Sequence, residues 1–217
     1  MPQGAALRSG DPEGRASLRL AGGATVRLDA ATRLRLASAA ILELESGAVY
    51  VDTGAGRGPI EVRTSLGTVR DVGTRFAVQV APETALRVRV RDGEVLTERR
   101  GRTYRTQAGE ELELRRNGTS ERRAVAPYGP SWEWTLEAAP AFDIEGRSLR
   151  EFLDWVSRET GWRIVFPDER LADSAAKIVL HGSLGGLRPD RAPFAVLPGA
   201  GLEGALRDGE LVVRAPR

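Results

Sequence analysis

The sequence predicts an all-β region of many short strands, followed by a small α/β domain. Up to residue 126, apolar and polar side chains alternate in short segments that end at turn signals about every 7 to 11 residues. Pro127, Gly129 and Pro130 interrupt this alternation, and a segment with helical period begins near Ser148. Alternation is typical of half-buried strands, whereas the later period indicates a helix between strands.

The predicted strands of the first region are separated by glycine, aspartate and asparagine turns such as Ser46-Gly47 and Asp92-Gly93. They cover Ser17–Leu20, Thr25–Leu28, Arg33–Leu36, Ile41–Glu45, Ala48–Val51, Ile60–Thr64, Thr68–Val72, Thr74–Val80, Ala85–Val90, Glu94–Arg99, Thr103–Thr106, Glu111–Leu114 and Ser120–Val125. Such a set can close as a sandwich, a barrel or a short β-solenoid, and alternation does not choose among them.

The densest strand signals lie between Gly58 and Glu98. Phe76 falls in the middle of an apolar face, so we expect it to be buried. Gly73 opens this strand, and we expect a positive φ or a close neighbour there. The next strand runs into Asp92-Gly93, which predicts a two-residue hairpin.

The segment after the proline break contains two indoles and a helix signal. Trp132 and Trp134 alternate with polar residues, which predicts a strand-like connector whose indoles pack onto one of the two domains. A short strand over Ala141–Glu145 should then precede a helix with a Ser148/Glu151 capping box and a left-handed cap at Gly161. The returning strand is predicted over Trp162–Phe166.

A second strand–helix–strand unit is predicted beyond a polar connector. Its parts are a strand at Ile178–Leu180, a helix at Pro189–Leu197 and a hairpin turning at Asp208-Gly209. Pro193 lies inside this helix, so we expect the helix to be short, displaced or irregular.

Composition excludes several kinds of chemistry. The 217 residues contain no cysteine and one histidine, His181, which rules out disulfides, thiol catalysis and a two-histidine metal site within one chain. Residues 1–130 hold 21 basic and 16 acidic groups, a net of +5, and residues 131–217 hold 11 and 14, a net of −3. No apolar run is long enough to span a membrane or to serve as a signal peptide.

The remaining candidate sites have simpler structural explanations. Paired acids such as Asp71, Asp92 and Glu94 would suit a glycosidase or lyase, but turns and solvent-facing positions carry such residues by default. The stripe of Arg87, Arg89 and Arg91 would suit phosphates, but it is also the ordinary polar face of a strand in a chain of low net charge. We therefore expect no enzyme, no cofactor and no nucleic-acid partner.

Several short sequence motifs in the β region resemble the FecR domain of periplasmic regulators of iron-uptake signalling. They are Gly67-Thr68-Val69, Val72-Gly73-Thr74-Arg75-Phe76-Ala77-Val78 and Val88-Arg89-Val90-Arg91-Asp92-Gly93-Glu94-Val95, with flanking matches at 23–32 and 44–51. The resemblance covers roughly residues 15 to 115. It favours a solenoid-like stack of strands and makes Gly67, Gly73, Thr74, Phe76, Asp92 and Gly93 a structural motif.

The C-terminal region is similar in pattern to the secretin/TonB short N-terminal domain, which commonly follows the FecR domain. The expected organisation is a flexible leader over 1–14, a FecR-like all-β domain over 15–126, a connector over 127–140 and a βαβ-βαβ type domain over 141–217. Trp155, at the margin of the helix's apolar face, is either packed at the core's edge or an anchor for a partner.

The resemblance also implies a function. In the family, the signalling domain of a TonB-dependent outer-membrane transporter contacts the periplasmic part of the regulator. A cytoplasmic segment, across one membrane helix, controls an extracytoplasmic-function sigma factor. We therefore expect a periplasmic signal relay, tethered to the inner membrane by an N-terminal helix missing from this chain. A free-standing carbohydrate- or envelope-binding β module is the alternative.

Overall fold

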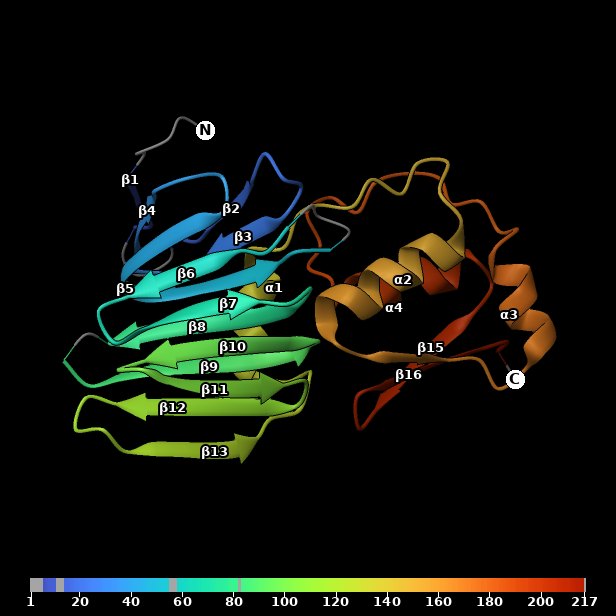
Figure 1. Cartoon of the computed structure of the whole chain (residues 1–217). Helices are drawn as coiled ribbons and strands as arrows, with labels where there is room; N and C mark the ends of the chain where they lie inside the picture. The colour runs from blue at the N-terminus through green and yellow to red at the C-terminus, as the bar shows by residue number, and fades with distance from the viewer. Residues whose placement is uncertain (1–5, 11–13, 55–57, 82, 217) are drawn as a thin grey trace. The chain divides into compact units, whose positions relative to one another are not determined.

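The computed structural model of the chain describes residues 6–10, 14–54, 58–81 and 83–216. These residues form two compact units, Met1–Pro127 and Tyr128–Arg217 (Figure 1). The first unit is mainly β, and the second is a small α/β region with its own sheet. Each unit has a separate hydrophobic core.

Within the described residues, unit 1 contains 13 strands that join into one sheet. The strands are β1 (Ala6–Arg8), β2 (Ala16–Arg19), β3 (Thr25–Leu28), β4 (Arg33–Leu36), β5 (Ile41–Asp52), β6 (Glu61–Thr64), β7 (Gly67–Asp71), β8 (Arg75–Ala81), β9 (Ala85–Asp92), β10 (Glu94–Arg99), β11 (Arg102–Gln107), β12 (Glu110–Arg115) and β13 (Ser120–Ala124). Most predicted strands are thus confirmed within a residue or two.

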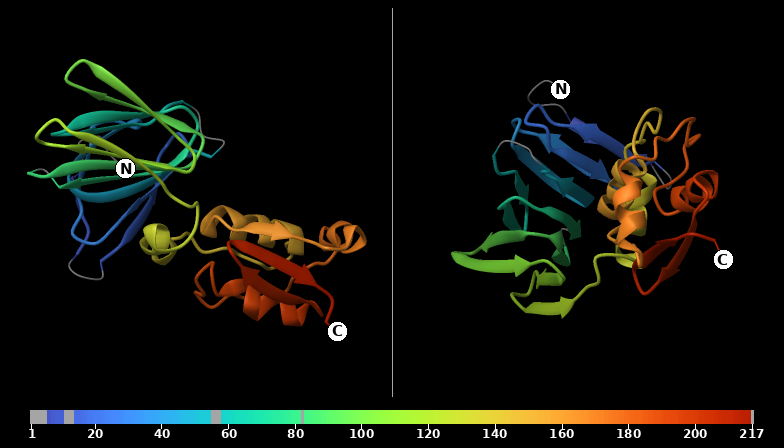
Figure 2. Two further views of the ribbon diagram at one scale, coloured as in Figure 1. Left: turned by 90° about the horizontal axis from the view of Figure 1, so that it is seen from below. Right: turned by 90° about the vertical axis from the view of Figure 1, so that its right-hand side faces the viewer.

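The sheet curls into two layers (Figure 2), and the strand pairing shows that β5 belongs to both. Layer 1 has the order β1-β4-β5-β6-β7-β10-β11, and layer 2 has the order β2-β3-β5-β8-β9-β12-β13. The first half of β5 pairs with β4 and β6, and its second half pairs with β3 and β8. Gly47, with φ of 92°, lies at the change of layer.

The core of unit 1 lies between these layers. Leu42, Val62 and Val95 from layer 1 pack with Val49 and Phe76 from layer 2, and all five are fully buried. Period-two alternation places these residues on the inner faces of their strands. Phe76 is buried, as predicted.

The solenoid-like stack is not confirmed. Apart from the parallel pair β5–β6, the described strands of unit 1 pair antiparallel in a curled mixed sheet. The predicted turn at Ser46-Gly47 is wrong, because the strand continues through it as a bend in β5. Part of the predicted flexible leader also forms structure, since Ala6–Arg8 pairs with β4; residues 1–5 and 11–13 lie outside the described residues.

The predicted hairpin at Asp92-Gly93 is wrong as well. β9 pairs with β8 and β12 in layer 2, whereas β10 pairs with β7 and β11 in layer 1. The dipeptide is therefore a corner between layers. Gly93 has φ of 78°, and a Cβ on it would lie 2.6 Å from Thr74 Cγ2 and 2.7 Å from the Gly73 carbonyl oxygen, so both backbone angle and space require glycine.

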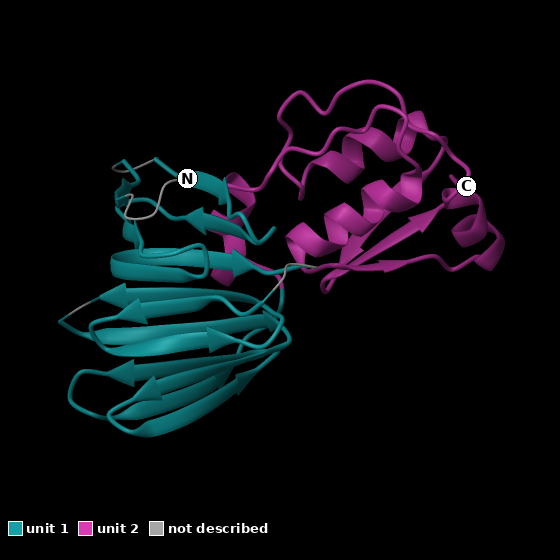
Figure 3. Ribbon diagram, turned by 45° about the horizontal axis from the view of Figure 1, so that its top comes forward, with its two compact units in different colours: residues 1–127 teal, residues 128–217 magenta. Residues whose placement is uncertain are grey.

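Unit 2, shown in magenta in Figure 3, contains a sheet of three strands in its described residues, in the order β14-β16-β15. Its elements are η1 (Pro130–Trp132), α1 (Glu133–Glu137), α2 (Leu149–Thr160), β14 (Arg163–Val165), α3 (Glu169–Ala175), α4 (Ala192–Gly199), β15 (Glu203–Arg207) and β16 (Glu210–Arg214). Leu211 and Val213 of β16 share a core with residues of α2 and α4, so both helices cover one face of this sheet.

Local signals explain α2 and the hairpin. The capping box is confirmed, since Ser148 and Glu151 exchange hydrogen bonds through side chain and backbone, and Gly161 has the predicted left-handed conformation at φ of 77°. The β15–β16 hairpin is also confirmed. Asp208 and Gly209 both have positive φ, which is the geometry of the favoured two-residue turn.

Other expectations for unit 2 are wrong. The Trp132–Leu136 segment is helical rather than strand-like, because Pro130 starts a short 3-10 turn that α1 continues; Trp132 is buried. Ala141–Glu145 forms no strand, and Ile178–Leu180 contributes an isolated bridge between Val179 and Ser148. The polar connector contains α3. The two complete βαβ units are therefore absent from the described residues, and likeness to the short N-terminal domain is not confirmed.

The second helix is displaced, as the prolines predicted. α4 starts at Ala192, so Pro193 lies in its first turn, where a backbone N–H would have no helical acceptor. Pro198 lies near its end. The helix is eight residues long.

Candidate partner-binding surface

Exposed apolar side chains gather in unit 2. Among the described residues, the large apolar side chains that are exposed are Val179 (53%), Leu187 (42%), Phe194 (42%) and Leu206 (43%) in unit 2, and Val72 (62%) in unit 1. Single exposed apolar residues need no explanation, but several on one small unit indicate a surface for a partner.

Two of these residues border a groove between the segment 178–184 and α4. The groove has a volume of about 380 Å³ and is lined mostly by apolar side chains, including those of Val179 and Leu187. On the α4 side it is bordered by the small residues Ala195, Gly199 and Ala200. A larger side chain at any of these would narrow the groove.

The loop beside the groove is held by charge. Arg188 Nε donates to Asp190 Oδ1 at 3.0 Å, and its Nη2 donates to Glu133. These carboxylates, Asp190 first, raise the pKa of the Arg188 guanidinium. The ion pairs join this loop, which follows the groove residue Leu187, to α1.

The edge of β15 offers a second contact surface. Within the described residues β15 pairs with β16 alone. In a two-residue hairpin the closing pair, Arg207 and Glu210, is hydrogen-bonded, so the backbone groups of Gly204 and Leu206 point outward from the sheet. An unpaired edge of this kind is a template for a strand of another protein.

Trp155 belongs to the edge of the core of unit 2. Its ring stacks on Phe142 with centroids 5.2 Å apart and lies 5.9 Å from Phe152. Its half-buried side chain also lines a hollow of about 210 Å³ that includes Pro140 and Leu187. The structure thus gives Trp155 a packing role, while its role as a partner anchor stays a prediction.

His181 and Glu145 form an exposed pair beside the groove. Glu145 Oε1 lies 2.9 Å from His181 Nδ1, and its Oε2 accepts the Gly182 N–H at 2.7 Å. The Gly182 N–H and then His181 lower the pKa of the Glu145 carboxyl. These two contacts attach Glu145 to the C-terminal end of the segment 178–182.

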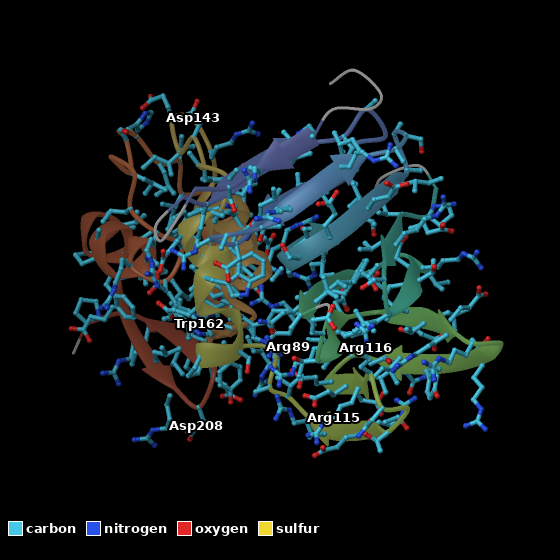
Figure 4. The ribbon with its side chains drawn as sticks, turned by 90° about the vertical axis from the view of Figure 1, so that its left-hand side faces the viewer. Arg89, Arg115, Arg116, Asp143, Trp162 and Asp208 are labelled. Atoms are coloured by element: carbon cyan, nitrogen blue, oxygen red, sulfur yellow. The ribbon has the colours of Figure 1, made fainter. Side chains whose placement is uncertain are left out.

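The arginine stripe of unit 1 is neutralised by neighbouring acids. Arg87 Nε donates to Glu113 at 2.6 Å, Arg89 donates to Glu111, and Arg115 also reaches Glu113, at 2.7 Å (Figure 4 labels Arg89 and Arg115). Such a ladder of opposite charges across β9, β12 and β13 stabilises the sheet face. This face of the sheet therefore has little net positive charge with which to bind the phosphate backbone of a nucleic acid.

Arg91 has a different environment from the rest of the stripe. It is the extra residue of a β-bulge, because Arg75 pairs with Asp92 and Phe76 pairs with Val90. Its guanidinium carbon lies 5.4 Å from the Tyr50 ring centroid, and that of Arg27 lies 5.0 Å from it. Burial lowers the pKa of Arg91, because it disfavours the charged form of the guanidinium. The contact with the Tyr50 ring acts in the opposite direction and stabilises the buried cation.

The ladder predicts a loss of stability in acid. Hydrogen bonds from Arg87 and then Arg115 lower the pKa of Glu113 from its ordinary value of 4.5. Because the folded pKa is below the unfolded one, the stabilisation is complete above about 4.5 and is lost as pH falls through the folded pKa. Urea unfolding over a pH series should show this loss, and Glu113→Gln should reduce it. Equal acid loss in Glu113→Gln and in the exposed control Glu121→Gln would contradict the assignment.

The comparison with protein families adds a decisive observation. A family model described as "FecR protein" matches residues 6–96. Residues 6–96 match a FecR domain. FecR is a non-enzymatic family, and the expectation that the chain is not an enzyme is confirmed on that basis. The match runs from β1 into β10 and includes all six residues of the predicted structural motif.

Two crystal structures share the fold. Both are described as a "putative anti-sigma factor" from Parabacteroides distasonis. One aligns with a TM-score of 0.52 and 16% identity over 98% of this chain and 100% of that chain. The other gives 0.51 and 17% over 98% and 99%. No curated protein sequence matches the chain. Among the described residues no helix is both long and apolar enough to cross a membrane.

The acids considered for catalysis have structural partners in the FecR domain. Asp71 is buried; it accepts the Ile60 N–H and, at 3.0 Å, the Gly73 N–H. Asp92 pairs with Arg75 at 3.2 Å, and Glu94 pairs with Arg105 at the same distance. Asp71 therefore fixes the turn at Gly73, whose φ is 84° as expected for that position.

The other motif residues pack the FecR domain. Thr74 N–H donates to Thr53 Oγ1 at 2.8 Å, while Thr53 Oγ1 donates to the Thr74 carbonyl at 3.0 Å. Gly67 lies against β10, since a Cβ on it would come within 2.9 Å of the Glu98 carbonyl oxygen. The sequence suggested exposable strand edges in the C-terminal domain, but it gave no sign of the groove, which has no residue pattern of its own.

Proposed function

We propose that this chain is the periplasmic signal-relay part of a FecR-type transmembrane regulator, with unit 2 as its docking surface. Its partner is the signalling domain of a TonB-dependent outer-membrane transporter of the iron or siderophore type. The regulator's cytoplasmic part controls an extracytoplasmic-function sigma factor across an inner-membrane helix. The observation that carries the docking assignment is the concentration of exposed apolar side chains around the groove and the β15 edge.

Two findings support the wider proposal. The FecR match covers most of unit 1, and structures described as a putative anti-sigma factor share the fold over nearly the whole chain, unit 2 included. A carbohydrate-binding β module receives less support. The described residues of unit 1 expose no aromatic side chain of the kind that stacks on sugars.

Docking through the β15 edge predicts a position-specific loss of binding. Leu206→Asp should weaken binding of the purified transporter signalling domain by about 2 kcal/mol, roughly 30-fold, because it places a charge in a desolvated contact. The domain encoded beside the gene is the partner to use, and calorimetry with the whole chain gives the affinity.

Val72→Asp is the matched control, since it makes the same kind of change at an exposed apolar residue of unit 1. We expect it to leave the affinity within about twofold of the wild-type value.

Trp155→Ala should also weaken binding by about 2 kcal/mol, but its contacts with Phe142 and Phe152 mean that stability must be measured in parallel. Weaker binding in Val72→Asp with full binding in Leu206→Asp would place the docking site in unit 1.

A further inference from the structure

An excess of positive charge lies at the tip of the β10–β11 hairpin. Arg100 and Gly101 form its two-residue turn, with φ of 49° and 75°. Arg99 and Arg102 are directly opposite each other on the two strands. Like charges in that position destabilise a sheet. Among the described residues, none of the three arginines forms an ion pair with a carboxylate.

Arg99 is the most unusual of the three, because it is only 8% exposed. Its one hydrogen bond within the described residues is from Nη2 to the Arg116 carbonyl oxygen at 3.4 Å, which is long and involves a neutral acceptor. A buried cation without a countercharge is costly.

The nearby acids are already engaged. Glu98 points to the opposite face of β10 from Arg99, and its carboxylate lies 2.7 Å from Arg70 Nη1. Glu83 pairs with Arg116 at 2.8 Å. Within the described residues neither acid forms an ion pair with Arg99, and the carboxylate of Glu98 is already neutralised by Arg70.

A hollow adjoins these cations. It has a volume of about 210 Å³ and is lined by Ser65, Leu66, Gly67, Glu98, Arg99 and Arg100. A Cβ at Gly67 would lie 2.9 Å from the Glu98 carbonyl oxygen and 3.6 Å from Arg99 Cβ. The close approach of β7 to β10 beside Arg99 therefore depends on glycine at position 67.

We propose that this hollow is a binding site for a phosphate group. Guanidinium groups match phosphate oxygens through paired N–H donors, and a tetrahedral dianion accepts from more donors than a carboxylate does. Arg99 supplies the buried donor, and Arg100 and Ser65 belong to the lining. Arg102 adds positive charge from the position opposite Arg99 in the hairpin. The phosphate is either free or part of a lipid headgroup.

Thermal unfolding and calorimetry of the whole chain with inorganic phosphate test the site, with chloride at equal ionic strength as reference. Phosphate should raise the Tm of the wild-type chain. Arg100→Gln should weaken phosphate binding at least about fivefold, and Arg99→Gln should weaken it further. Arg33→Gln removes an exposed cation from β4 in the same unit, and it should change the affinity less than about twofold.

Vesicles of phosphatidylcholine with and without phosphatidic acid identify the source of the phosphate. Binding to the anionic vesicles that Arg100→Gln abolishes assigns a lipid headgroup, and binding of inorganic phosphate alone assigns the free ion. The proposal is overturned if phosphate stabilises no more than chloride and no vesicle binds. It is also overturned if Arg100→Gln and Arg102→Gln, both exposed and unimportant for packing, bind phosphate as the wild type does.

Discussion

Replacing Phe76 with alanine is expected to lower the free energy of unfolding of the chain by about 3–5 kcal/mol. The ring is fully buried near the start of β8, between the layers of unit 1. Truncation removes the transfer free energy of the ring and leaves a cavity that the rigid strands on both sides cannot close. Among the described residues of this core cluster, Phe76 has the largest fully buried side chain.

Urea denaturation followed by far-ultraviolet circular dichroism measures this loss. Tryptophan fluorescence would report on unit 2 instead, because the four tryptophans lie there. Phe76→Leu keeps most of the volume and should cost less than about 2 kcal/mol. Val72→Ala, at an exposed position, should stay within about 0.5 kcal/mol. A loss below about 1 kcal/mol for Phe76→Ala would show that the site collapses or that the ring is not in the core.

Gly47→Ala is expected to cost about 2–5 kcal/mol. Alanine at the φ of 92° found here is strained by about 1–2 kcal/mol. Its Cβ would also lie 2.5 Å from Thr32 Oγ1 and 2.6 Å from Thr32 Cα, and overpacking of this kind adds about 1–3 kcal/mol. Moving Thr32 would break the 3.1 Å hydrogen bonds of its hydroxyl with the Ala48 N–H and carbonyl.

Gly73→Ala separates these two causes. Gly73 has a similar φ of 84°, but nothing lies within 4 Å of the position that a Cβ would occupy. Strain alone should therefore cost about 1–2 kcal/mol there. Equal losses for Gly47→Ala and Gly73→Ala, measured by the same denaturant titration, would contradict the overlap with Thr32.

Local alternation predicted the strands of unit 1 well, and β3, β4 and β10 have the predicted bounds. Pairing was harder to predict, because it depends on residues distant in the sequence. Asp92-Gly93 has the same positive φ at glycine whether the chain turns back on itself or crosses to another layer. Only the partners of β9 and β10 distinguish these cases, and sequence periodicity does not reveal them.

In unit 2 the capped helix and the final hairpin were predictable because their signals are chemical and local. The helical connector was not predictable from alternation, since alternation over a few residues fits either a strand or one turn of helix. Pro130, which starts the helical turn, was the better indicator. The sequence pointed to strand edges and Trp155 of residues 141–217 as a docking surface, but it could not reveal the groove or the arginine cluster. Exposure of Leu206 and Phe194, and the unpaired charge of Arg99, depend on which segments pack beside them.

The passage of β5 through both layers has a mechanical consequence. In a sandwich whose layers meet only through side chains, one layer can slide or peel from the other without breaking a strand. Here the same backbone is hydrogen-bonded to β4 and β6 along one half and to β3 and β8 along the other. Tension applied to either layer is carried to the other through covalent bonds, so the two layers yield to force together.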